Sequence, residues 1–121
     1  MTQFMNKTLH SYLDYPVALG LIAMPGILGL GAVNPLAFWL SIATGFAALL
    51  LTIFTDHQFG LVKIIPYKLH LLVDFMVGAA FVAAPFILGF AGLEAAYYWV
   101  LGATVLLVVA LDNTRSAEKP A

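Results

Sequence analysis

The sequence contains no cysteine, and this absence excludes disulfide bonds, thiolate nucleophiles and thiolate metal ligands. Charge is also scarce, because Asp, Glu, Lys and Arg together make up 9% of the 121 residues. A soluble domain carries about 25% charged residues. The formal net charge is −1, so the chain lacks the excess of basic residues that would indicate a nucleic-acid partner. Glycine-rich nucleotide loops, nucleophile elbows and HExxH motifs are missing too.

Apolar residues are abundant instead. They form 63% of the chain, whereas a soluble domain contains about 45–50%. A chain this short has too little interior to bury so much apolar surface, which makes a lipid bilayer its natural solvent. The N-terminal segment does not combine a basic stretch, an apolar core and a cleavage site, so we expect no removable signal peptide. The sequence predicts a single transmembrane domain over residues 1–121.

Four apolar segments are long enough to cross a bilayer, which takes about 20 residues of α-helix. Their expected ranges are 12–30, 36–54, 69–90 and 95–111. The apolar runs are continuous rather than alternating, which favours helices over the strands of a membrane barrel. Two of the connections are short, and the third is a polar linker over about residues 56–68. The predicted fold class is therefore an all-α membrane protein with four transmembrane helices, arranged as two helical hairpins.

The second half of the chain repeats the first half at an offset of 60 residues, the distance from His10 to His70. Identical residues recur at this offset in the pairs His10 and His70, Asp14 and Asp74, Pro25 and Pro85, and Trp39 and Trp99. We infer a duplicated hairpin, with repeat 1 at about residues 9–55 and repeat 2 at about residues 69–112. Each repeat crosses the membrane twice, so both enter in the same direction. A pseudo-two-fold axis along the membrane normal should then relate them.

The segments around the two repeated prolines carry a family resemblance. They read AMPGILGL and AAPFILGF. Together with the duplication, they resemble the Ser-Pro-Trp (SPW) repeat family of small bacterial membrane proteins, over nearly the whole chain. Met24 and Ala84 occupy the Ser positions of the motif, and Gly26 and Phe86 occupy the Trp positions. The resemblance implies a duplicated four-span protein, and it assigns no catalytic residue.

Two ionisable pairs lie near the starts of the first and third segments, at His10 and Asp14 and at His70 and Asp74. Residues four apart on a helix project from one face, and acids in spanning helices usually face the bundle interior. We therefore expect these four side chains to form one inward-facing cluster at the cytoplasmic end of the bundle. Three roles are open at this stage, namely a structural hydrogen-bond cluster, a cofactor or metal site, and a proton path.

The cofactor and metal hypotheses assign specific ligands. His10 and His70 could ligate haem b from its two faces. Alternatively, His10, Asp14, His70 and Asp74 hold a divalent metal such as zinc, iron or manganese. The proton path is less favoured, because the outer half of the predicted bundle offers only hydroxyl side chains, apart from Glu94 in a turn.

Two further features of the spans carry structural expectations. Pro25 and Pro85 lie within helical patterns, where proline removes a backbone hydrogen bond and clashes with the preceding turn, so we expect each to kink its helix. Aromatic residues gather near the side opposite the cations, at Trp39, Tyr97, Tyr98 and Trp99. Such rings usually lie at the lipid–water interface, and we expect them to anchor the helices there.

The predicted function is association within the membrane. The loops are short, the exterior is almost wholly apolar and no catalytic motif is present. We expect an accessory or scaffolding subunit, or a homo-oligomer, rather than an enzyme. Its partners would be lipid and other membrane proteins or further copies of itself, and not nucleic acid. The alternative is a haem- or metal-binding protein that uses the His10 and His70 pair in electron transfer.

The cations predict the orientation of the chain in the bacterial inner membrane. All Lys and Arg residues lie in three segments on one side of a four-span protein, and they are Lys7, Lys63, Lys68, Arg115 and Lys119. The positive-inside rule then puts both termini and the linker in the cytoplasm. We expect a reporter that is active only in the periplasm to stay inactive when it is fused after Ala121. A fusion ending in the 91–94 turn is the positive control, and full activity after Ala121 would reverse the topology.

Overall fold

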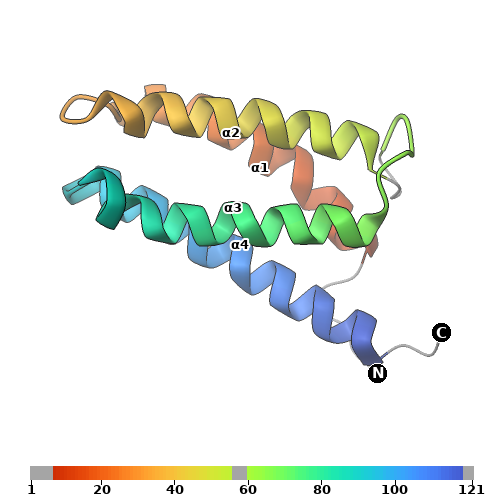
Figure 1. Ribbon diagram of the computed structural model, residues 1–121. Coiled ribbons are helices and arrows are strands. Elements are labelled where there is room, and N and C mark those ends of the chain that lie inside the picture. The colour runs from red at the N-terminus through yellow and green to blue at the C-terminus, as the bar shows by residue number, and fades with distance from the viewer. Residues whose placement is uncertain (1–6, 56–59, 119–121) are drawn as a thin grey trace.

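A computed structural model describes residues 7–55 and 60–118 of the chain, with the side chains of residues 7, 8, 10 and 113–118 outside the description (Figure 1). The helices are α1 (Lys7–Leu28), α2 (Pro35–Phe54), α3 (Tyr67–Leu88) and α4 (Gly92–Glu118). Each contains a segment long and apolar enough to cross a membrane. The predicted all-α, multi-pass architecture is thus confirmed. Helix α1 begins before its predicted span and α4 extends past its predicted span at both ends, because backbone hydrogen bonding continues where the apolar run stops. Helices α1 and α3 end at Leu28 and Leu88, slightly before the predicted ends at 30 and 90.

The helices pair as two hairpins. Helix α1 packs along α2 and α3 packs along α4, whereas the backbones of different hairpins approach each other at few places. In Figure 1 the α1–α2 hairpin lies above the α3–α4 hairpin. The two short turns lie at one end of the bundle, which we call the turn end. The start of α1, the connection from α2 to α3 and the end of α4 lie at the other end, which we call the linker end.

Pro25 and Pro85 lie in the last turns of α1 and α3, which continue through them to Leu28 and Leu88. The end of α3 is closed by Gly89, whose left-handed backbone (φ 76°) lets its N–H donate to the Pro85 carbonyl at 3.0 Å. After α1, the N–H of Leu30 donates to the Pro25 carbonyl at 2.9 Å. The repeated prolines therefore mark the points where the chain leaves the helices for the turns. The expected kinks stay a prediction.

The buried core lies toward the turn end. Its largest side chains are aromatic, with the ring of Tyr98 centred 4.5 Å from that of Phe81 and 4.8 Å from that of Phe90. The tyrosines expected as interface anchors, Tyr97 and Tyr98, are buried instead (8% and 0% exposed). Their hydroxyl groups form hydrogen bonds with residues of α2. At the lipid–water interface, water would satisfy these groups instead. The expected anchors Trp39 and Trp99 are exposed.

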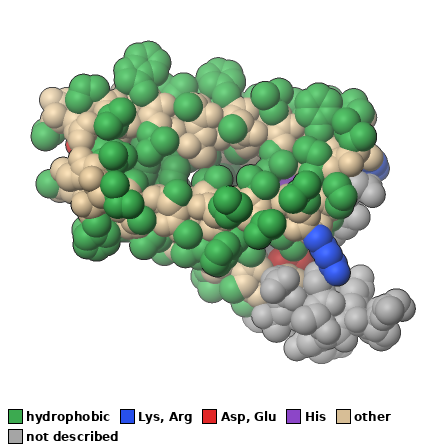
Figure 2. Space-filling model, in the orientation of Figure 1, with side chains coloured by type: hydrophobic (Ala, Val, Ile, Leu, Met, Phe, Trp, Pro, Cys, Tyr) green, Lys and Arg blue, Asp and Glu red, His purple; other side chains and the backbone are tan. Residues whose placement is uncertain are grey.

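The exterior is apolar. Figure 2 shows hydrophobic side chains over the length of one face, with the Lys and Arg side chains of that face gathered at the linker end. Large outward side chains include Ile27, Phe86 and Ile87, all more than 70% exposed. Exposure of this kind in water would favour aggregation, whereas lipid tails solvate it. The surface agrees with embedding in a membrane.

Glycines bring the two helices of each hairpin close together. A Cβ atom built at Gly102 would lie 2.8 Å from the carbonyl oxygen of Gly78 and 2.9 Å from the nitrogen of Val82. One built at Gly45 would lie 2.9 Å from the carbonyl oxygen of Ala18. Small residues allow membrane helices to pack backbone against backbone. These contacts are with main-chain atoms, which cannot rotate away.

We expect Gly102→Ala to lower the free energy of unfolding by about 1–3 kcal/mol, the usual effect of overpacking. The matched control is Gly20→Ala on α1, because a Cβ atom there meets nothing within 4 Å. That control should leave stability unchanged or raise it by up to about 1 kcal/mol, since alanine restricts the unfolded chain. Unfolding by SDS in detergent micelles provides the measurement. Equal stability of the two variants would contradict the close approach of α3 and α4.

Candidate functional site

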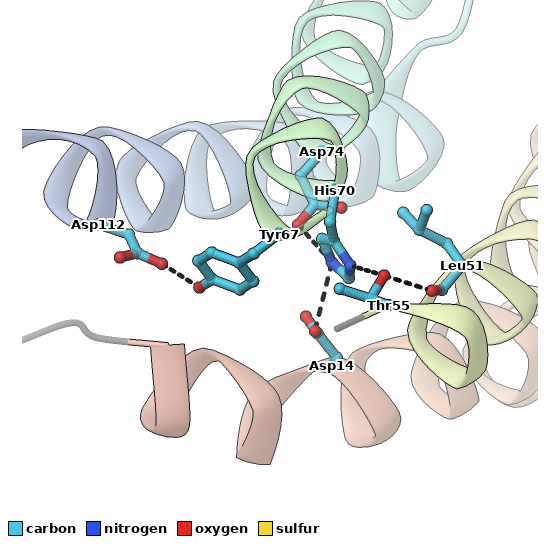
Figure 3. Close-up of polar contacts among 7 residues, drawn as sticks. All are labelled: Asp14, Leu51, Thr55, Tyr67, His70, Asp74 and Asp112. Carbon is cyan, nitrogen blue, oxygen red and sulfur yellow. Dashed lines mark hydrogen bonds and ion pairs between the residues drawn. The ribbon is translucent and has the colours of Figure 1, made fainter. Parts of the chain in front are cut away.

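The candidate site at the linker end is built around His70, whose side chain is 1% exposed. Its Nε2 atom lies 3.3 Å from Oδ2 of Asp14 on α1 and 3.1 Å from Oδ2 of Asp74, one turn further along α3 (Figure 3). The structure thus brings together three of the four residues singled out from the sequence. The fourth, His10, belongs to α1, and its side chain lies outside the described residues. The Asp14–His70 contact joins the two hairpins.

The second ring nitrogen of His70 is engaged as well. Its Nδ1 lies 2.7 Å from Oγ1 of Thr55, and the Thr55 hydroxyl donates to the carbonyl of Leu51 at 2.5 Å (Figure 3). A hydroxyl has one proton to donate, so in this arrangement Nδ1 donates to Oγ1. Because Nε2 faces two carboxylate oxygens, the contacts fit an imidazolium that donates from both nitrogens. Thr55 lies at the C-terminal cap of α2, so helices α1, α2 and α3 all meet at this ring.

A tyrosine and an aspartate extend the polar cluster to α4. The hydroxyl of Tyr67 donates to Oδ2 of Asp112 (Figure 3). The Tyr67 ring also stacks on His70, with the ring centroids 6.2 Å apart. Asp112 is 2% exposed and lies within α4 rather than at its end, because the helix continues to Glu118. Sequence analysis did not identify this pair, since a tyrosine next to the linker carries no pattern that points to α4.

A second polar cluster lies at the turn end, around Glu94. Its Oε2 atom accepts hydrogen bonds from the backbone N–H groups of Gly31 (3.0 Å), Val33 (3.3 Å) and Asn34 (3.3 Å). In return, Nδ2 of Asn34 donates to the carbonyl of Leu88 at 2.9 Å. Oε1 of Glu94 is buried and has no hydrogen-bond partner among the described residues. Each hairpin therefore bonds to the turn region of the other.

Buried hydroxyl groups add further bonds between the hairpins. The hydroxyl of Tyr98 donates to the carbonyl of Ala37 at 2.8 Å. Oγ of Ser41 lies 2.6 Å from the hydroxyl of Tyr97 in the other hairpin, and within its own hairpin it donates to the carbonyl of Leu21 at 2.8 Å. The hairpins are thus joined by polar contacts at both ends, although their backbones approach closely at few places.

Between the two polar clusters the four helices surround a cavity of about 290 Å³. Asp14, His70 and Asp74 contribute to its wall. Most of the remaining wall is aliphatic, as at Leu21 and Val77. The site therefore combines a charged end with an apolar chamber.

The charged end has donor atoms suited to a divalent cation. One ligand atom from each of Asp14, His70 and Asp74 lies within 4.8 Å of the other two, and nitrogen with carboxylate oxygen is a donor set that zinc, iron and manganese accept. The same atoms already satisfy one another as hydrogen-bond partners. A haem with two histidine ligands would also need the side chain of His10. Metal and haem binding both stay predictions.

We expect Asp14→Asn to lower the free energy of unfolding by about 1.5–3 kcal/mol, the range for a hydrogen bond to a charged group. A double-mutant cycle with His70→Gln should give a coupling energy of about 0.5–3 kcal/mol, because the two side chains are in contact. The control is Lys68→Gln, an exposed residue on α3, which should change stability by less than about 0.5 kcal/mol. If the effects of Asp14→Asn and His70→Gln on the free energy of unfolding are additive, the Asp14–His70 contact does not hold the hairpins together.

The sequence matches the family model of the SPW repeat domain over residues 8–112. Among curated proteins and solved structures, none matches the chain. The matched region runs from the first turn of α1 to Asp112, so it includes the four spanning segments, both polar clusters and the cavity. With this match over most of its length, the chain belongs to the SPW repeat family of multi-pass membrane proteins.

Proposed function

We propose that the protein acts by association in the bacterial inner membrane, as an accessory or scaffolding subunit or as a homo-oligomer. The observation that carries the proposal is the low burial of its spanning helices. Between 22% and 33% of the residues in each spanning segment are buried within the chain. The remaining helix faces are free to pack against lipid or against another protein.

Large side chains cover these outward faces. Trp39, Phe46, Phe75 and Phe86 are each more than half exposed. Because lipid tails are as apolar as leucine, helices associate in a membrane through close packing rather than through the hydrophobic effect. Rigid aromatic side chains offer extensive contact area for such packing. The polar side chains at each end of the bundle are engaged within the chain, by other side chains at the linker end and by backbone N–H groups at the turn end, which favours a structural role for them over a catalytic one.

A pseudo-two-fold relation between the hairpins is part of the proposal. Three pairs of identical residues at the 60-residue offset line the same cavity, and they are Asp14 and Asp74, Val17 and Val77, and Thr44 and Thr104. Asn34 and Glu94, also 60 residues apart, each bond to the opposite hairpin. An axis along the membrane normal would present any partner surface twice, which favours closed, symmetric assemblies.

The proposed orientation has both termini and the linker in the cytoplasm. Lys63 and Lys68 are exposed at the linker end. Lys7 belongs to the start of α1 and Arg115 to the last turns of α4, which lie at the same end, and the short turns contain no Lys or Arg. This asymmetry is the pattern that the positive-inside rule associates with a cytoplasmic face.

We expect photocrosslinking from the outward face of α3 to yield a product of defined mass in native membranes. Benzoylphenylalanine in place of Phe75 or Phe86 should give this product, because both side chains are exposed. The same substitution at Phe81, which lies on α3 and is 4% exposed, is the matched control and should give none. Association is wrong if the exposed positions yield only lipid adducts and the purified protein is monomeric in nanodiscs.

A further inference from the structure

The central cavity has no role in the proposed association, which takes place on the outward faces of the helices. It draws residues from all four helices and has a volume of about 290 Å³. Figure 2 shows a hollow between the two hairpins near the middle of their length. Small-molecule sites in proteins have volumes of about 300–1,000 Å³. The cavity is therefore large enough for a compact organic molecule.

The wall of the cavity has two chemically different parts. The larger part is aliphatic and includes Leu21, Val73 and Val77. The other part is the end where the carboxylates of Asp14 and Asp74 meet. Among the described residues that line the cavity, none is Lys or Arg. His70 lines this end too, and as an imidazolium it balances one of the two carboxylates, which leaves one negative charge. The wall is thus complementary to a molecule with one positive group and an apolar body.

The two carboxylates retain capacity to bind a ligand while they contact His70. Each uses Oδ2 in its contact with Nε2, and an ionised carboxyl group offers about four lone-pair sites on its two oxygens. The side chains of Asp14 and Asp74 are 10% and 20% exposed, so a ligand can reach them. An ammonium group beside them would gain charge attraction in surroundings of low dielectric constant.

We propose that the cavity binds a lipophilic organic cation, with its ammonium group at Asp14 and Asp74 and its apolar part among Leu21, Val73 and Val77. A divalent metal ion would occupy only the carboxylate end and leave the aliphatic chamber unfilled. A neutral acyl chain would displace water from two carboxylates without replacing its hydrogen bonds, which is unfavourable. The proposal does not depend on association, so either one can fail without the other.

Binding of benzyltrimethylammonium to the full chain in nanodiscs of zwitterionic lipid tests the proposal. Titration calorimetry gives the affinity, with empty nanodiscs as the blank. Neopentylbenzene has the same shape, with carbon in place of the charged nitrogen, and is the neutral competitor. We expect saturable binding of the cation. The neutral molecule should bind at least about tenfold more weakly than the cation. Equal affinity for the two, or the absence of saturable cation binding, would overturn the proposal.

Variants locate the bound cation. Asp74→Asn should weaken binding about tenfold or more, whereas Asp74→Glu, which keeps the charge, should retain it. Val77→Phe fills the chamber without changing a carboxylate, and it should abolish binding. Met76→Ala, at an outward position on α3, is the matched control and should bind as the parent does. Unchanged binding by Val77→Phe would put the cation outside the cavity. If Asp74→Asn does not fold, the comparison of charged and neutral ligands on the unmodified chain still decides.

Discussion

The arrangement of the two hairpins depends on polar contacts between them, of which the contact between His70 and Asp14 is the charged one at the linker end. Within a bilayer, apolar helix faces gain little by leaving lipid for one another. Close packing of glycines holds each hairpin together, but few such contacts join one hairpin to the other. Hydrogen bonds and ion pairs then have a large share in fixing the relative position of the hairpins. With a donor on each ring nitrogen, His70 bonds to α1 through Asp14, to the end of α2 through Thr55 and to Asp74 of its own helix.

The two ends of the bundle use different chemistry for the same purpose. At the linker end, charged side chains bond to each other around one imidazole. At the turn end, a carboxylate bonds to the backbone N–H groups of a loop, which forms a concave anion-binding site of the kind found in tight turns. Between them the helices are separated enough to leave a chamber. The cavity is thus a consequence of joining two hairpins mainly at their ends.

Hydropathy and the repeated His and Asp were sufficient to predict the helices and the grouping of Asp14, His70 and Asp74. The pattern worked because helical periodicity puts residues four apart on one face, and burial of charge in lipid is unfavourable without a partner. Thr55 and Tyr67 were missed because a hydroxyl near a helix end can bond in many ways, and only the register of the helices selects one. Glu94 was missed for a related reason. Its partners are backbone N–H groups, which every sequence contains.

Asn34 and Glu94 stand at equivalent positions of the two hairpins, 60 residues apart, and each bonds to the opposite hairpin. This pairing of two different residues requires that both hairpins belong to one chain or to two different chains. In a dimer of one identical hairpin, both turn regions would carry the same residue at this position, either two carboxylates or two amides. A single chain removes that restriction, so one hairpin can provide the amide and the other the acid. Only one buried negative charge then has to be accommodated at the turn end. A single chain thus permits different residues at the two equivalent positions, which two identical subunits could not have.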